Sequence, residues 1–159
     1  MSMKFSPGIL IVPITLLFTG CGGLALRPAD FAWPFESVFK VDSKGIAAEE
    51  EQPARYFITF NAKPLLFEET GDSVHVADRT LRVIRDGEGY YFITGKEFKN
   101  VYVFSSSEGA LAIEKKIPVS EKGLESPAFN HRPPYVQLLN GKEAAKMLDK
   151  NGVKEGGKK

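Results

Sequence analysis

The chain has 159 residues, 43% hydrophobic and 11% aromatic, which is enough for one ordinary domain with a core of its own. Its 21 basic and 20 acidic side chains give a formal net charge of +1, so no strong field attracts nucleic acid or an acidic substrate, and we expect no nucleic-acid partner. With a single cysteine the domain has no internal disulfide, and its stability must come from the core.

The N-terminus has the features of a secretory signal. Lys4 supplies an early positive charge, residues 9–18 form a short apolar run, and two small residues then precede Cys21. A membrane-spanning helix needs about 20 apolar residues, and this run is shorter. The pattern therefore predicts that residues 1–20 are a signal peptide.

A small residue followed directly by Cys21 resembles the lipobox of bacterial lipoproteins, and the resemblance covers residues 1 to about 23. It implies that Cys21 carries diacylglycerol and an N-acyl chain such as palmitate, which anchor the protein to a membrane. Gly22 stands where an Asp typically marks retention at the inner membrane, so the implied address is the outer membrane of the cell envelope. No acidic residue follows the cysteine directly, which favours the periplasmic face. The alternatives are a Gram-positive source, with the domain outside a single membrane, and an ordinary secreted protein with a free cysteine.

Residues 21–34 are predicted to be a lipidated tether, because Pro28 and Pro34 prevent a continuous helix. Three aromatic residues are concentrated at its end: Phe31, Trp33 and Phe35. Aromatic side chains favour both membrane interfaces and protein interfaces. This cluster either packs onto the edge of the domain or binds a partner.

Residues 35–140 are predicted to form a β domain, because short segments rich in β-branched and aromatic residues alternate with turn residues. The strands are expected at 36–41, 55–61, 80–85, 89–94, 100–105 and 110–117, with weaker candidates at 64–68, 73–76 and 135–139. Residues 86–89 and 105–109 are predicted to be tight hairpin turns, and 42–45 the start of a longer connection. The expected fold class is all-β, an antiparallel meander that forms a small sandwich or barrel.

The central strands are apolar on both faces. Tyr91 alternates with Phe92, and Tyr102 and Phe104 flank Val103. A one-layer sheet would expose one of these aromatic faces to water. Either further layers cover both faces, or an aromatic face containing Tyr91, Tyr102 and Phe104 binds a partner.

The chain beyond Ser120 is predicted to be loop-like. Pro133 and Pro134 favour an extended segment at 130–135, which is either a stiff crossing or a polyproline-type recognition segment. Residues 141–159 are predicted to form a short helix, at 142–150, and a lysine-rich tail. The tail is either solvated or in contact with anionic lipid.

The sequence contains no pattern typical of an enzyme, so we expect a non-catalytic protein without metal or cofactor other than the lipid on Cys21. His75 and His131 are not in a metal-ligand spacing. Ser37-Val38-Phe39-Lys40 matches Ser-x-x-Lys by sequence, but it lies in a predicted strand and lacks the companion motifs of penicillin-recognising enzymes. The acidic runs at 49–51 and 68–69 are expected to be solvated loop charges.

Two functions remain. The first is a non-catalytic accessory or structural subunit of an envelope assembly, at the outer membrane by the implied address, held by protein–protein interaction. The alternative is a lipocalin-like carrier or sensor of a small apolar ligand, an inference from barrel architecture alone.

Overall fold

The computed structural model describes residues 36–49, 58–72 and 74–154. The predicted signal peptide and tether, with Cys21, Phe31, Trp33 and Phe35, lie outside the described residues. The described chain folds mostly into antiparallel strands with one short helix, which confirms the predicted all-β class. The strands and the helix are β1 (Ser37–Val41), β2 (Ile46–Glu49), β3 (Phe60–Asn61), α1 (Lys63–Thr70), β4 (Thr80–Arg85), β5 (Tyr91–Gly95), β6 (Asn100–Ser107), β7 (Ala110–Pro118), β8 (Pro127–Arg132), β9 (Tyr135–Asn140), β10 (Lys146–Asp149) and β11 (Gly152–Lys154).

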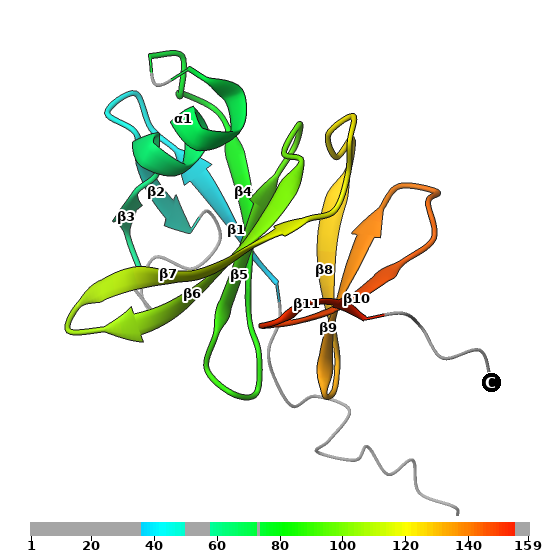
Figure 1. Ribbon diagram of the computed structural model, residues 1–159. Helices are drawn as coiled ribbons and strands as arrows, with labels where there is room; N and C mark the ends of the chain where they lie inside the picture. The colour runs from blue at the N-terminus through cyan, green and yellow to red at the C-terminus, as the bar shows by residue number, and fades with distance from the viewer. Residues whose placement is uncertain (1–35, 50–57, 73, 155–159) are drawn as a thin grey trace, which may run out of the picture. The chain divides into compact units, whose positions relative to one another are not determined.

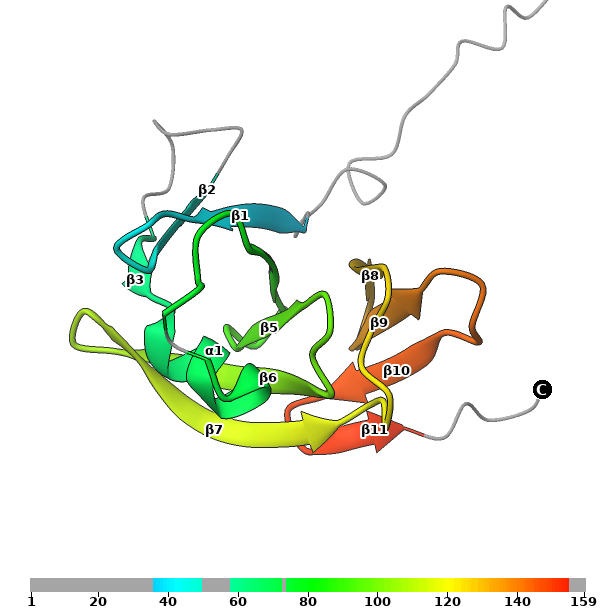
Figure 2. The same cartoon turned by 90° about the horizontal axis from the view of Figure 1, so that it is seen from above.

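Sheet A contains seven strands in the order β3-β2-β1-β4-β5-β6-β7, all antiparallel. It curls into a half-barrel, with α1 within the curl (Figures 1 and 2). The β4–β7 portion is a meander whose β4–β5 and β6–β7 hairpins lie at the predicted positions, because Gly89 and Gly109 supply the positive φ angles of these two turns. A bulge between Val103 and Phe104 shifts the register between β6 and β7.

The central strands of sheet A bury apolar side chains on both faces. On the inner face, Ile93 and Tyr102 pack with Leu66 of α1 and with residues of β1 and β4. On the outer face, Phe92 and Val103 belong to a second cluster. The two-sided apolar pattern of these strands therefore reflects two separate cores, with Tyr91 and Phe104 of the inner face only partly buried.

Sheet B has the order β11-β10-β9-β8 and supplies the other half of the second core. Phe129, Val136, Leu138 and Leu148 of this sheet are all buried in the cluster that contains Phe92. Polar contacts reinforce the junction, because Glu36 Oε1 accepts a hydrogen bond from the backbone N–H of Phe129 at 2.8 Å. The fold is therefore a half-barrel with a small second sheet packed on its outer face.

The strand predicted at 64–68 is wrong, since these residues lie in α1. Pro64 stands in the first turn of this helix, where its missing N–H costs nothing. Gly71 ends the helix in the left-handed conformation, and its N–H donates to the carbonyl oxygen of Phe67. A proline near the start and a glycine just past the end are typical of a helix.

The helix predicted at 142–150 is also wrong, because the chain there forms the β10–β11 hairpin. Lys150-Asn151 makes the turn, and Asp149 Oδ1 accepts hydrogen bonds from the backbone N–H groups of Asn151 and Gly152, at 2.8 and 3.1 Å. Burial alone would raise the pKa of Asp149, but Lys154 and these two N–H groups outweigh it and lower the pKa. Pairing with β9 and burial of Leu148 outweigh the local preference of this segment for a helix.

The segment after Ser120 is not a loop throughout, since β8 pairs with β9 and the two proline residues 133 and 134 make the connecting turn. The predicted crossing at 130–135 is therefore a hairpin. Residues 42–45 likewise form a tight turn into β2, a strand that the sequence analysis missed, with Asp42 Oδ1 accepting from two backbone N–H groups. Of the candidate strand at 73–76, Val74, His75 and Val76 are not in a strand.

The remaining strand predictions hold at most of their described positions. The candidate at 135–139 is confirmed as β9, and 80–85 as β4. Of the strand expected at 55–61, only Phe60–Asn61 are paired; residues 55–57 lie outside the described residues. In the part of the chain that the structure describes, no helix has the length and apolar character to cross a membrane.

Candidate functional site: an apolar pocket in the half-barrel

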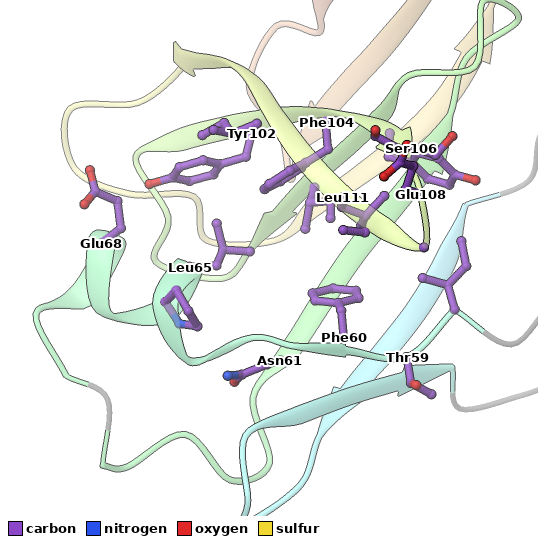
Figure 3. A pocket seen from close by; sticks show the side chains of 18 of the residues that line it. Thr59, Phe60, Asn61, Leu65, Glu68, Tyr102, Phe104, Ser106, Glu108 and Leu111 are labelled. Carbon is purple, nitrogen blue, oxygen red and sulfur yellow. The ribbon is translucent and has the colours of Figure 1, made fainter.

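A pocket of about 1010 Å³ lies inside the curl of sheet A. Figure 3 shows side chains from several elements converging on it, with Tyr102 and Phe104 on β6, Leu65 on α1 and Phe60 on β3. Its volume is at the upper end of the roughly 300–1,000 Å³ typical of small-molecule sites. The lining residues are Ile58, Thr59, Phe60, Asn61, Pro64, Leu65, Glu68, Tyr91, Ile93, Tyr102, Phe104, Ser106, Ser107, Glu108, Gly109, Ala110, Leu111, Ile113 and Lys116.

The wall on β5 and β6 is aromatic. Tyr91 lies opposite Phe104 in the β5–β6 register, and Ile93 lies opposite Tyr102, so the four side chains share the inner face. The rings of Tyr102 and Phe104 are stacked, with centroids 6.5 Å apart. Alternation along two paired strands thus produces a continuous apolar surface.

A polar cluster lies behind Tyr102, at the corner where α1 meets β6 beside the pocket. Glu69 Oε1 accepts hydrogen bonds from Tyr102 Oη at 2.8 Å and from Asn100 Nδ2 at 2.5 Å, and Glu69 Oε2 accepts one from the backbone N–H of Lys99 at 2.8 Å. Burial raises the pKa of Tyr102, and the hydrogen bond to Glu69 raises it further, so this phenol stays protonated at physiological pH. Tyr102 acts here as a hydrogen-bond donor.

The neighbouring carboxylate, Glu68, pairs with Lys116 Nζ at 2.7 Å, and that ammonium group lies 5.6 Å from the centroid of the Tyr102 ring. The acidic residues at 68–69 were predicted to be solvated loop charges. They instead lie in a helix and make specific contacts. Both carboxylates belong to a helix and attach it to the β6–β7 hairpin. Glu68 and Lys116 neutralise one another at the edge of the pocket, and Glu108 is the other charged residue among those that line it.

The pocket opens along β7. Ile113 lines it, yet 59% of this residue is exposed, and Leu111 is half-buried. The β6–β7 turn adds the exposed residues Ser106, Ser107 and Glu108 to the rim. An exposed large aliphatic side chain beside an apolar cavity indicates a surface that can receive another apolar group.

Three of the predicted partner-binding residues meet at this pocket: Tyr91, Tyr102 and Phe104. Tyr102 is only 2% exposed, so it forms part of the wall rather than a projecting surface. Leu65 and Ile113 were not among the site residues predicted from the sequence. Leu65 was assigned to a strand, and the hydrophobic alternation at Leu111 and Ile113 of β7 was the available signal for the other side of the pocket.

Of the groups considered for catalysis, Glu68 lines the pocket, whereas Ser37, His75 and His131 do not. His75 is exposed and its Nδ1 lies 2.8 Å from Asp72 Oδ2; the backbone N–H groups of Val74 and His75, with the His75 side chain, lower the pKa of Asp72 to about 2. Ser37 Oγ donates to Glu49 Oε1 at 2.7 Å, a contact between neighbouring strands. His131 lies on β8. Residues 36–49, 58–72 and 74–154 contain no cluster of three or more His, Cys, Asp or Glu that could hold a metal ion.

The pocket thus combines an aromatic wall, an aliphatic opening and the Glu68–Lys116 ion pair at its edge. Comparisons of the chain with protein-family models, with curated proteins and with solved structures found no match.

Proposed function

We propose that this protein is a non-catalytic, lipid-anchored accessory subunit of a cell-envelope assembly, in which the half-barrel pocket receives apolar side chains of a partner protein. The observation that carries the proposal is the convergence of Tyr91, Tyr102 and Phe104 on one pocket that stays open at Ile113. Aromatic pockets that can be desolvated by a partner concentrate binding energy in protein interfaces. The lipobox-like sequence ending at Cys21 supports an outer-membrane address, with the periplasmic face favoured.

The test uses the full-length protein, tagged at its C-terminus, expressed in its own host and extracted in mild detergent. Proteins that co-purify are quantified by mass spectrometry for the wild type and for Ile113→Glu. Because Ile113 is exposed, the substitution places a charge at the pocket opening without removing a core side chain. We expect stoichiometric partners with the wild type and their loss from Ile113→Glu.

Phe67→Glu is the matched control. Phe67 is a large apolar residue with 57% exposure, on α1, but it does not line the pocket. This variant should retain the partners. Retention by both variants, or the absence of any stoichiometric partner of the wild type, would count against the proposal.

A second candidate function is supported by the size of the cavity. A volume of about 1010 Å³ with an apolar lining can hold a small apolar ligand, as the carrier hypothesis requires. Organic extracts of the purified protein would then contain a defined lipid in stoichiometric amount, distinct from the acyl chains attached to Cys21. Phe104→Ala should reduce the amount of that lipid, while Phe67→Ala should not.

A further inference from the structure

The pocket lies between the two edges of sheet A. In the strand order β3-β2-β1-β4-β5-β6-β7, the first and last strands are the edges. Both contribute to the lining, β3 through Phe60 and Asn61, and β7 through Leu111 and Ile113. Figure 2 shows the curl that brings the sheet round from β3 to β7. The half-barrel is therefore incomplete at the place where its pocket opens.

The two edges differ in what they offer to a binding partner. β3 has two residues, whereas β7 has nine, and within the described residues β7 pairs only with β6. One side of β7 thus presents backbone N–H and C=O groups that no other strand uses. Such an edge is a template for an added strand.

The side chains of β7 define what an added strand must carry. Leu111 and Ile113 face the pocket, so residues beside them on the new strand would be apolar. Lys116 is already paired with Glu68. Lys115 is exposed, lies opposite Val103 on the other face of the sheet, and has no ion pair among the described residues. An acidic residue beside Lys115 would complement its charge.

We propose that the partner contributes an extended segment that pairs along β7. Alternate apolar residues of this segment enter the pocket beside Leu111 and Ile113, and an acidic residue on its opposite face pairs with Lys115. The inference rests on the proposed function and names the structural element that the partner supplies. A lipid would occupy the cavity but has no regular series of donors and acceptors to match the β7 backbone, and this distinguishes the two occupants.

Hydrogen–deuterium exchange of the full-length protein tests the pairing directly. The wild-type complex, co-purified from its host, is compared with the Ile113→Glu protein purified without partner. We expect the amides of residues 110–116 to exchange at least several-fold more slowly in the complex, because strand addition gives them new hydrogen-bond acceptors. The amides of β9, which is paired with β8 on one side and β10 on the other, serve as an internal control and should change little.

Charge reversal tests the polar side of the proposal. Lys115→Glu should reduce co-purification of the partner several-fold, and Lys115→Arg should restore it. Lys122→Glu is the matched control, since Lys122 is an exposed lysine in the loop between β7 and β8. Equal co-purification by Lys115→Glu and wild type would overturn the assignment of an acidic residue beside Lys115.

The outcomes separate this inference from the proposed function. If a partner is lost in Ile113→Glu but leaves the β7 amides unprotected in the wild-type complex, the accessory function stands and strand addition is wrong. If the protected species is a second copy of this chain, or the cavity holds only a lipid, the proposed partner segment is overturned. If no partner co-purifies with the wild type, both proposals fail.

Discussion

Tyr102 Oη donates a hydrogen bond to Glu69 Oε1 at 2.8 Å, joining β6 to a helix that lies 33 residues earlier in the chain. The same carboxylate accepts from Asn100 and from the backbone of Lys99. A single glutamate therefore satisfies three donors at the corner of the pocket, and this contact holds α1 against the sheet. Burial of Leu65 and Leu66 alone would leave the polar end of the helix unattached.

Glu69→Ala should lower the free energy of unfolding by about 1–3 kcal/mol, because it leaves the buried Tyr102 hydroxyl and the Asn100 amide without their acceptor. Tyr102→Phe should cost less, about 0.5–1.5 kcal/mol, since Glu69 keeps its other two donors. Urea denaturation measures both. Glu121→Ala, at an exposed glutamate in the loop after β7, is the control and should stay close to wild type.

The stability of the junction between the two sheets should depend on pH, because Glu36 titrates there. Burial raises the pKa of this carboxyl group above 4.5, and the opposing effects of the Phe129 N–H and of Arg82 do not cancel it. The folded protein therefore binds more protons than the unfolded chain between pH 4.5 and the folded-state pKa. The contribution of Glu36 is fully present below pH 4.5 and is lost as the pH rises through its folded-state pKa.

The measurement compares urea midpoints of the wild type and Glu36→Gln over a series of pH values. The stability of the wild type relative to Glu36→Gln should fall through that window and then become constant. Other titrating groups are common to both proteins and cancel in the difference. A difference that rises with pH would show that Arg82 and the Phe129 N–H dominate and that the pKa of Glu36 is lowered.

Neighbouring residues on β10 should respond very differently to truncation. Leu148 is fully buried between the sheets, so Leu148→Ala should cost about 2–5 kcal/mol of unfolding free energy. Met147 lies on the opposite face and is only half-buried, so Met147→Ala should cost clearly less. Thermal or urea unfolding distinguishes them. If the two variants lost similar amounts of unfolding free energy, the alternation of Met147 and Leu148 between the faces of β10 would be contradicted.

Gly123 should not tolerate a side chain. Its φ of +94° strains an L-residue, and a Cβ atom there would lie 2.7 Å from the carbonyl oxygen of Glu97. Gly123→Ala should therefore lower the free energy of unfolding by more than about 1 kcal/mol. Gly87→Ala is the control, because a Cβ atom at that turn position has open space. Wild-type stability of Gly123→Ala would show that the Glu97 and Leu124 backbones move apart readily.

The β4–β7 meander could be predicted from the sequence because its determinants are local. The strand at 80–85 is rich in β-branched residues, and Gly89 and Gly109 have the positive φ angles, +98° and +81°, that few other residues adopt. Periodicity could not identify α1 as a helix rather than a strand, since five of its residues, 64–68, also fit a short strand. Its proline and glycine positions were the better guide, because each acts on the backbone directly.

The helix predicted at 142–150 was wrong for a different reason. Glu143, Ala144 and Ala145 favour a helix in isolation, but they precede β10 in the folded chain. Leu148 gains more from burial against Phe129 and Val136 than the segment loses in helical propensity. Asn151-Gly152 fits either a helix end or a hairpin turn, and only the neighbouring strand β9 selects the hairpin.

The candidate site shows the same division. The sequence by itself determined that Tyr102 and Phe104 share a face, because strand alternation has a period of two, whereas the β5–β6 register places Tyr91 beside them. Only the tertiary structure decided that this face is the inner wall of a half-barrel, that Glu69 satisfies Tyr102, and that Phe60 and Ile113 lie at one pocket. Sheet curvature and the position of α1 bring together residues distant in the chain, and no local pattern specifies such contacts.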